Sequence, residues 1–254
     1  MITGLLALAA IAVVTVVTIL VSRTVGRVSV VDVAWGLFFV AAAVTLAVRA
    51  DTWHSWLLAA LVAIWGGRLA WHIHRRSRGH GEDPRYAEML GDGGFGLAVR
   101  KVFLTQALAA WLVSLSLIVA GAYDVRWTWV VWLGVALWLV GLVFESVGDA
   151  QLAAYRSIPK DRKPPVMETG LWRFTRHPNY FGDACVWWGL WLAGAVATGW
   201  WQGLLTVVAP IAMTYFLAFA TGARLLERTM MKRPGYPEYA ARTSMFLPLP
   251  PRRS

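Results

Sequence analysis

Charged side chains are scarce in this sequence. They make up 15% of its 254 residues, whereas soluble domains contain about 25%. The hydrophobic class reaches 58% and is concentrated in long apolar runs. A helix that crosses a lipid bilayer needs about 20 consecutive apolar residues, and several runs approach that length. The composition therefore excludes an ordinary soluble domain and indicates an integral membrane protein.

Strict alternation of polar and apolar residues, the pattern of a membrane β-barrel, is missing from these runs. Because lipid offers no water to the backbone, a spanning segment must then be a helix. The first run has no basic residue before it and no clear cleavage site after it, so we expect it to be retained. The sequence predicts an all-α bundle of about seven transmembrane helices in a single domain, residues 1–254. The expected spans are Ile2–Val21, Val30–Val48, Trp56–Trp71, Val102–Ala122, Trp127–Val147, Cys185–Thr198 and Leu204–Thr221.

Lysine and arginine are almost absent from alternate loops. With the N-terminus outside, the segments that fall inside hold 21 of these residues and the segments that fall outside hold 2. The positive-inside rule then predicts an external N-terminus and a cytoplasmic C-terminus, in what we expect to be a bacterial inner membrane. The net charge of +10 is accordingly explained by topology and by attraction to membrane lipid. It does not indicate nucleic-acid binding.

Several familiar kinds of site are missing. The single cysteine, Cys185, excludes an internal disulfide. No Gly-x-Gly-x-x-Gly run follows a strand, which excludes a Rossmann nucleotide site. His72, His74 and His80 lack the His-Glu-x-x-His spacing of a zinc site, so we expect no metal. Any cofactor would have to bind within the helix bundle.

Polar residues near the span ends are spaced to share a helix face. Glu145 and Asp149 lie four apart at the end of the fifth predicted span, and Asn179 and Asp183 lie four apart at the start of the sixth. Such residues indicate a functional site by default, because lipid would leave their desolvation cost without compensation. Solvation at the interface, pairing with loop arginines or an interhelical hydrogen bond is the structural alternative.

The connection between the third and fourth spans ends in the run Gly81-Glu-Asp-Pro-Arg-Tyr86. Its glycines predict a turn. Glu82, Asp83 and Arg85 can form a knot of helix capping and ion pairing. The functional alternative is that Arg85 and Tyr86 close over a cofactor or supply a proton.

Short motifs over nearly the whole chain carry a family resemblance. The N-terminal half contains Asp32-x-x-Trp35-Gly36, and Arg68 followed by the run that ends at Tyr86. The C-terminal half, residues 127–250, contains Gly170-Leu-Trp-x-x-x-Arg176-His-Pro-x-Tyr-x-Gly182, Leu226-Glu227, Tyr236-x-x-Tyr239 and Phe246-x-Pro248. This set resembles the superfamily of steroid 5-alpha-reductases (3-oxo-5-alpha-steroid 4-dehydrogenases) and isoprenylcysteine methyltransferases. Within it, the nearest likeness is to a bacterial branch of 5-alpha-reductase-like proteins.

The resemblance implies NADPH as cofactor. The steroid reductases contact NADPH through an asparagine and an aspartate four apart and an arginine seven further on. Glu145, Asp149 and Arg156 hold these positions, with Glu145 replacing the asparagine. The catalytic candidates are His72, which aligns with the reductase tyrosine, together with Tyr86 and Asp32. The residues implied to bind the cofactor are Glu145, Asp149, Arg156, Arg173, Arg176, His177, Asn179, Tyr180, Asp183, Glu227 and Tyr236.

The sequence is compatible with three functions. The first is an NADPH-dependent oxidoreductase that reduces a carbon–carbon double bond in a lipophilic enone or sterol-like lipid, with its cofactor site facing the cytoplasm. The second is an S-adenosylmethionine-dependent methyltransferase acting on a lipid-soluble acceptor, because both groups share the Arg-His-Pro run. The third is a non-catalytic lipid-binding membrane protein. The sequence predicts neither the substrate nor the oligomeric state.

Overall fold

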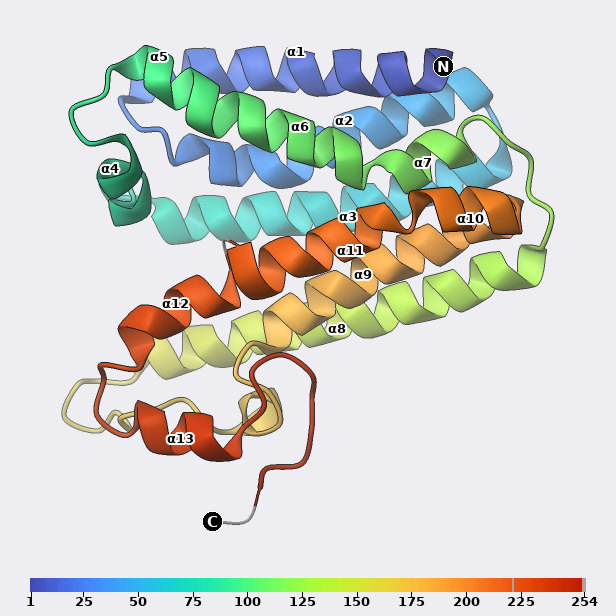
Figure 1. Cartoon of the computed structure of the whole chain (residues 1–254). Helices are drawn as coiled ribbons and strands as arrows, with labels where there is room; N and C mark the ends of the chain where they lie inside the picture. The colour runs from blue at the N-terminus through green and yellow to red at the C-terminus, as the bar shows by residue number, and fades with distance from the viewer. Residues whose placement is uncertain (221, 253–254) are drawn as a thin grey trace. The chain divides into compact units, whose positions relative to one another are not determined.

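The computed structural model describes residues 1–220 and 222–252, as helices joined by loops (Figure 1). The chain divides into two compact units. Unit 1 comprises residues 1–128 and 194–209, and unit 2 comprises residues 129–193 and 210–254. Within the described ranges, the only β-type pairing is an isolated bridge between Thr175 and Ser244.

Among the described residues, six helical segments are long and apolar enough to cross a membrane, which confirms the all-helical fold with apolar spans. Large apolar side chains such as Val13 and Leu20 of the first segment are more than half exposed, as suits a surface that faces lipid. The six segments are Ile2–Val25, Val30–Ala50, Trp53–Ser77, Phe95–Val113, Thr128–Ser157 and Trp200–Met230.

The predicted sixth span is not among these six segments. In place of Cys185–Thr198, the structure has α9 (Pro178–Gly194), which begins seven residues earlier and contains 17 residues. The proline suits the first helical turn, because its missing N–H would have no partner there. The seventh predicted span is part of the longer segment Trp200–Met230, and its last residue, Thr221, lies outside the described residues.

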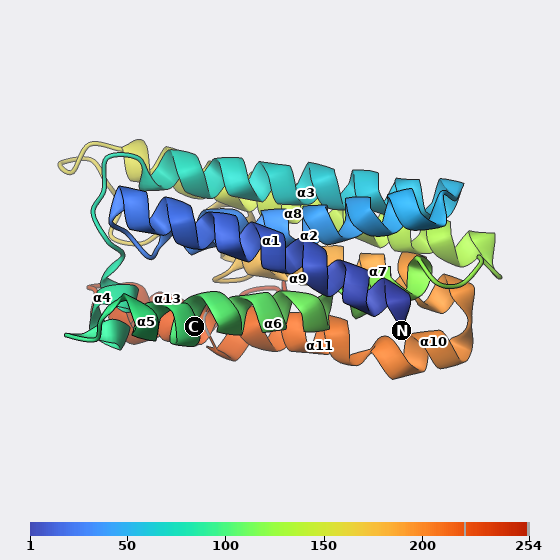
Figure 2. The ribbon, with the colours of Figure 1, turned by 90° about the horizontal axis from the view of Figure 1, so that it is seen from above.

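Unit 1 is built on α1 (Ile2–Val25), α2 (Val30–Ala50) and α3 (Trp53–Ser77) (Figure 2). Gly26 ends α1 with a φ of 70°, a left-handed conformation that favours glycine. Thr52 and Ser55 form a capping box that starts α3. A Cβ at Gly36 would lie 2.5 Å from the Gly66 carbonyl oxygen, so α2 and α3 meet backbone to backbone.

Shorter helices complete unit 1. The α6 helix runs alongside α1 (Figure 2), and Trp111 of α6 donates its indole N–H to the Gly4 carbonyl at 3.0 Å. The predicted span Val102–Ala122 is interrupted at Ser114, whose hydroxyl bonds back to the Ala110 carbonyl at 2.8 Å. These elements are α4 (Pro84–Leu90), α5 (Phe95–Ala98), the π-helix η1 (Val99–Phe103), α6 (Leu104–Val113), α7 (Leu115–Ala120), η3 (Val196–Thr198) and α10 (Trp200–Thr206).

Unit 2 contains the long helix α8, the helix α9 and the C-terminal elements. The α8 and α9 helices pack through glycines placed seven residues apart on each helix. A Cβ at Gly141 would lie 2.5 Å from the Gly182 carbonyl oxygen, and a Cβ at Gly189 would lie 2.6 Å from that of Gly134. The elements of unit 2 are α8 (Thr128–Ser157), η2 (Gly170–Arg173), α9, α11 (Val208–Tyr215), the π-helix η4 (Phe216–Ala220), α12 (Ala223–Met230) and α13 (Tyr236–Arg242).

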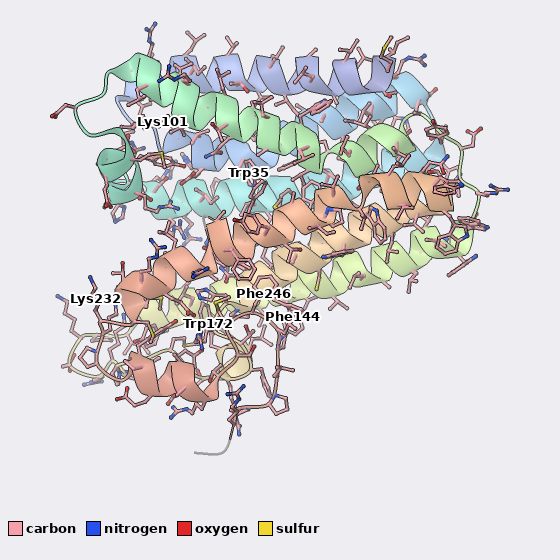
Figure 3. All side chains as sticks on the ribbon, in the orientation of Figure 1. Trp35, Lys101, Phe144, Trp172, Lys232 and Phe246 are labelled. Atoms are coloured by element: carbon pink, nitrogen blue, oxygen red, sulfur yellow. The ribbon has the colours of Figure 1, made fainter. Side chains whose placement is uncertain are left out.

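The C-terminal segment of unit 2 returns to the region where α9 begins. Phe246 and Phe144 both pack on Phe181, with ring centroids 6.3 and 5.2 Å away. Trp172 is buried and donates its indole N–H to the Gly148 carbonyl at 3.1 Å. Figure 3 labels Phe144, Trp172 and Phe246 on this part of the chain. The glycine packing and this aromatic contact together hold the polar residues of α8 and α9 in place.

Candidate functional site

The loop between α3 and α4 is held on unit 1 by two reciprocal contacts. Arg27 donates to the backbone carbonyls of His80 at 2.5 Å and Ser77 at 3.3 Å. Glu82 accepts the backbone N–H groups of Val28 at 2.5 Å and Ser29 at 2.9 Å. These hydrogen bonds lower the pKa of Glu82 by more than its burial raises it. Glu82 is therefore ionised over a wide pH range and fixes the start of α4.

The docked loop brings Tyr86 of α4 onto Asp32 in the first turn of α2. The Tyr86 hydroxyl donates to Asp32 Oδ1 at 2.5 Å. Gln106 of α6 donates its amide Nε2–H to the same hydroxyl oxygen at 3.1 Å. Burial and the adjacent Asp32 carboxylate raise the pKa of Tyr86 well above its ordinary value. We call Tyr86 and Asp32 the tyrosine–aspartate pair, and it holds a phenolic proton in a partly buried position.

Arg85 supplies the positive charge beside this pair. Its Nη2 atom lies 3.1 Å from Asp32 Oδ2 and 2.8 Å from Asp83 Oδ2. Asp83 also caps α4 by accepting the Arg85 backbone N–H at 2.9 Å. The hydrogen bonds to Arg85 lower the pKa of Asp83 despite partial burial. The capping and ion-pair knot expected among these residues is thus present.

In unit 2, acidic side chains of α8 and α9 are buried. Glu145 and Asp183 are only 3% and 6% exposed. Asn179 donates its amide Nδ2–H to Asp149 Oδ1 at 3.1 Å. The Asn179 Oδ1 atom is buried and has no hydrogen-bond partner among the described residues. Such an atom has lost its water and can accept a hydrogen bond from a ligand.

A second polar cluster of unit 2 centres on Glu227 of α12. Arg176 contacts it in a bidentate ion pair, with Nε–Oε1 at 2.6 Å and Nη2–Oε2 at 2.8 Å. His177 Nε2 lies 3.2 Å from Glu227 Oε1, and the Tyr236 hydroxyl donates to the same oxygen at 3.4 Å. Burial and the charge of Glu227 raise the pKa of Tyr236, which therefore keeps its proton. We call these four residues the Glu227 cluster.

The Glu227 cluster also ties down the C-terminal segment. Arg176 Nη1 donates to the Ala240 and Thr243 carbonyls at 2.7 and 2.6 Å. At least four hydrogen bonds of this guanidinium, which has five N–H donors, therefore go to the protein itself. The Tyr239 hydroxyl donates to the Trp172 carbonyl at 2.5 Å. Arg176 thus acts in this structure as a clamp between the start of α9 and the chain end.

Comparison with known families gives a match that includes residues of both units. The matching family carries the description "Protein of unknown function (DUF1295)" and aligns with residues 18–243. The chain belongs to the DUF1295 family. No curated protein and no solved structure matches it. The matched range includes the tyrosine–aspartate pair and the Glu227 cluster, so both lie within the DUF1295 domain.

The DUF1295 structure brings together some of the residues singled out from the sequence. Asp32 and Tyr86 are in contact in unit 1. His72 lies part-buried on α3. In unit 2, His177 stacks on Tyr180 with ring centroids 5.5 Å apart. Arg156 and Arg173 have exposed side chains, at the end of α8 and on η2. The remaining candidates of unit 2 belong to the acidic group or to the Glu227 cluster.

The sequence did not predict the role of Gln106, nor the contacts by which Arg27 and Glu82 each dock the loop before α4. The signal for Gln106 was present, because it is a lone amide within an otherwise apolar predicted span. Arg27 gave no such signal, because its charge was fully explained by topology. Its role depends on backbone carbonyls about fifty residues further along the chain.

The donor set of unit 2 fits the polar parts of NADPH only in part. The buried Asn179 Oδ1 and the neighbouring carboxylates suit amide N–H groups and ribose hydroxyls. The phosphates need cations, and Arg176 is already paired with Glu227. Arg173, whose side chain is exposed, is therefore the better phosphate ligand.

Proposed function

We propose that this DUF1295 protein is a membrane-embedded, NADPH-dependent reductase of a carbon–carbon double bond in a lipophilic enone or sterol-like lipid. The observation that carries the proposal is the tyrosine–aspartate pair, with Tyr86 Oη 2.5 Å from Asp32 Oδ1. Reduction of an enone needs an acid near the carbonyl oxygen, and methyl transfer does not. The proposal assigns proton delivery to the tyrosine–aspartate pair.

The chain's part in the reaction follows from its own residues. When bound, NADPH supplies a hydride to the electron-poor carbon of the double bond. The Tyr86 hydroxyl stabilises the negative charge that develops at the substrate carbonyl oxygen and supplies a proton there. Asp32 and Arg85 hold Tyr86 in place and provide a polar route for a replacement proton. A positioned acid of this kind contributes about 10²–10⁴-fold to a rate.

The cofactor contacts are assigned within unit 2. Asn179 accepts an amide or hydroxyl hydrogen at its buried Oδ1 atom. Glu145, Asp149 and Asp183 bind sugar hydroxyls or order the helix ends, and Arg156 and Arg173 bind phosphate. The Glu227 cluster, with Tyr180 stacked on His177, shapes the wall of the site by holding the start of α9.

An S-adenosylmethionine-dependent methyltransferase is the second candidate, and a specific observation favours it. Three carboxylates, those of Glu145, Asp149 and Asp183, are buried or nearly so in unit 2. Acidic groups complement the sulfonium and ammonium cations of S-adenosylmethionine better than they complement phosphates. Under this alternative the tyrosine–aspartate pair has a structural role.

We also propose a number of spans and an orientation in the membrane. The 17-residue helix α9 crosses as a seventh span, the N-terminus lies outside, and the basic loops face the cytoplasm of a bacterial cell, where NADPH is present. The loop arginines fit this orientation by the positive-inside rule. Labelling of single cysteines placed at Arg162 and Arg49 tests it, because only the first should be accessible from the cytoplasmic side.

A ligand-induced shift in melting temperature tests the proposal. A ligand that binds only the folded protein stabilises it by about 2.7 kcal/mol at one hundred times its Kd. We expect NADPH to raise the melting temperature of the purified protein in detergent and S-adenosylmethionine to leave it unchanged. The reverse result supports the methyltransferase. A response to neither cofactor, together with stabilisation by lipid, supports a non-catalytic lipid-binding protein.

A further inference from the structure

Gln106 takes part in a hydrogen-bond chain of fixed direction. Its amide Nε2 atom donates to the Tyr86 hydroxyl oxygen at 3.1 Å, and Tyr86 donates to Asp32 Oδ1 at 2.5 Å. The three residues come from α6, α4 and α2, which meet only through the tertiary fold of unit 1. Gln106 is part-buried in the span Phe95–Val113.

The number of available protons determines which group donates in each hydrogen bond between Gln106, Tyr86 and Asp32. A phenol has one proton, and two oxygens 2.5 Å apart must share a proton to avoid repulsion. With Asp32 ionised, the Tyr86 proton is the one shared with it. If Gln106 turned its carbonyl oxygen toward the Tyr86 oxygen, no proton would lie between these two oxygens. The amide must therefore present its N–H, as the structure has it.

The ion pair with Arg85 favours the ionised form of Asp32, which then accepts the Tyr86 proton. Arg85 contributes Nη2 to the second Asp32 oxygen at 3.1 Å. Arg76 of α3 attracts Asp32 and Asp83, while Asp83 itself repels Asp32. Arg85, next in sequence to Tyr86, lies with its guanidinium carbon 5.7 Å from the Tyr86 ring centroid. The hydrogen bonds thus run from Gln106 to Tyr86 and from Tyr86 to Asp32, and Arg85 donates to the second Asp32 oxygen.

We propose that Gln106 is a positioning residue that controls where the Tyr86 proton can go. Because Gln106 can only donate to Tyr86, the Tyr86 proton has two possible acceptors, Asp32 and a substrate oxygen. This inference rests on the proposed function, in which Tyr86 is the proton donor. It adds that the correct delivery of the proton depends on an amide outside the pair.

The proton balance of the reaction shows why this matters. Hydride adds to carbon, the Tyr86 O–H bond breaks, and a new O–H bond forms on the substrate oxygen, giving an enol that rearranges to the ketone. The Tyr86 oxygen then carries a negative charge, which the Gln106 N–H stabilises. One proton from water, received through Asp32, restores the phenol. The sum consumes one hydride and one proton per double bond.

The test uses a polyfluorinated tyrosine at position 86 of the full-length protein, whose phenol ionises in an accessible pH range and reports by fluorine NMR. Gln106→Met removes all polarity at similar length, and Gln106→Glu keeps the side-chain shape and, in its ionised form, removes the donor. Gln202→Met is the matched control, because Gln202 of α10 lies against Gly199. Loss of one net hydrogen bond should raise the ionisation pH of the labelled phenol by about one unit in both Gln106 variants and leave it unchanged in Gln202→Met.

An unchanged ionisation pH in a folded Gln106→Glu or Gln106→Met variant overturns the inference, and either variant alone suffices if the other does not fold. With a substrate in hand, Gln106→Glu should lower kcat about ten-fold at constant KM. A loss confined to KM contradicts the positioning role. If the ionisation shifts but NADPH-dependent turnover is never observed, the Gln106 inference stands and the proposed function fails.

Discussion

Arg176 and Glu227, 51 residues apart in the sequence, form a bidentate ion pair with side chains only 11% and 13% exposed. This pair joins the Arg-His-Pro run at the start of α9 to the helix α12. The Arg176 bonds to Ala240 and Thr243 extend the junction to the chain end. The most recognisable motif of the sequence is therefore, in this structure, the centre of a structural clamp.

Removal of the Arg176 side chain should destabilise unit 2. Breaking a buried ion pair typically costs about 3–5 kcal/mol, because the remaining charge is left unpaired. We expect Arg176→Ala to lower the melting temperature and to expose residues 236–252 to limited proteolysis. Arg173→Ala is the control, since its exposed side chain should affect the NADPH response and not the stability of the free protein. Equal stability of Arg176→Ala and the wild type contradicts the clamp.

The docking of the loop that precedes α4 should depend on pH. The pKa of Glu82, whose carboxylate makes the docking bonds to Val28 and Ser29, lies below its ordinary value of 4.5. A carboxyl whose folded-state pKa is depressed stabilises the fold fully above its unfolded value and loses that contribution as the pH falls through the folded value. A nitroxide attached at His80→Cys should therefore become mobile only below about pH 4.5.

Glu82→Gln provides the control for this measurement. The neutral amide can accept one backbone N–H but cannot reproduce the charge-assisted pair of bonds to Val28 and Ser29. The nitroxide in this background should be more mobile already at neutral pH and should lose its pH dependence. A transition at the same pH in the variant would show that another group controls the loop.

The glycine packing between α8 and α9 should not tolerate side chains. A Cβ at Gly182 would lie 2.5 Å from the Gly141 carbonyl oxygen and would also clash with the Glu145 backbone. We expect Gly182→Ala to destabilise the protein by about 1–3 kcal/mol. Gly67→Ala on α3 meets nothing within 4 Å and should stabilise it by about 0.5–1 kcal/mol. Thermal melting of both variants measures these changes in stability.

Asn179 should affect ligand response more than stability. Its Nδ2 atom bonds Asp149, while its buried Oδ1 atom has no partner among the described residues. Asn179→Ala should therefore melt near the wild type and lose the NADPH-induced stabilisation. Gln151→Ala is the contrasting variant, because Gln151 accepts the Leu171 N–H at 3.0 Å and its loss should lower stability without abolishing the NADPH response. A stability loss in Asn179→Ala that fully accounts for its weaker response would give this residue a structural role.

Six apolar helical segments could be predicted in outline from the sequence, because each depends on local composition. The errors are local as well: Ser114 interrupts a span through its own hydroxyl, and α9 begins at Pro178 because the polar residues after it are packed against α8. Hydropathy had left these residues out of the apolar run, although the four-residue spacing of Asn179 and Asp183 placed them at the start of the same helix. A window of average hydropathy cannot recognise a helix whose first turns are polar on one face.

The pairing of the site residues could not be predicted, because it depends on tertiary contacts. Tyr86 and Asp32 were each candidates, but only docking of the loop by Arg27 and Glu82 brings them together. Arg176 and Glu227 were both expected to bind the cofactor, because the family resemblance implies it. That they bind each other could not be seen, because they lie 51 residues apart in the sequence.

Transfer of deuterium from NADPH deuterated at the reactive carbon tests the central claim most directly. Purified protein in lipid vesicles, supplied with the labelled cofactor and a panel of lipophilic enones, should yield a saturated ketone that contains one deuterium, measured by mass spectrometry. Tyr86→Phe should lower the rate by about 10²–10⁴-fold while it keeps the NADPH-induced melting shift. Transfer of a labelled methyl group from S-adenosylmethionine to a lipid acceptor, with no deuterium in any enone product, would contradict the account.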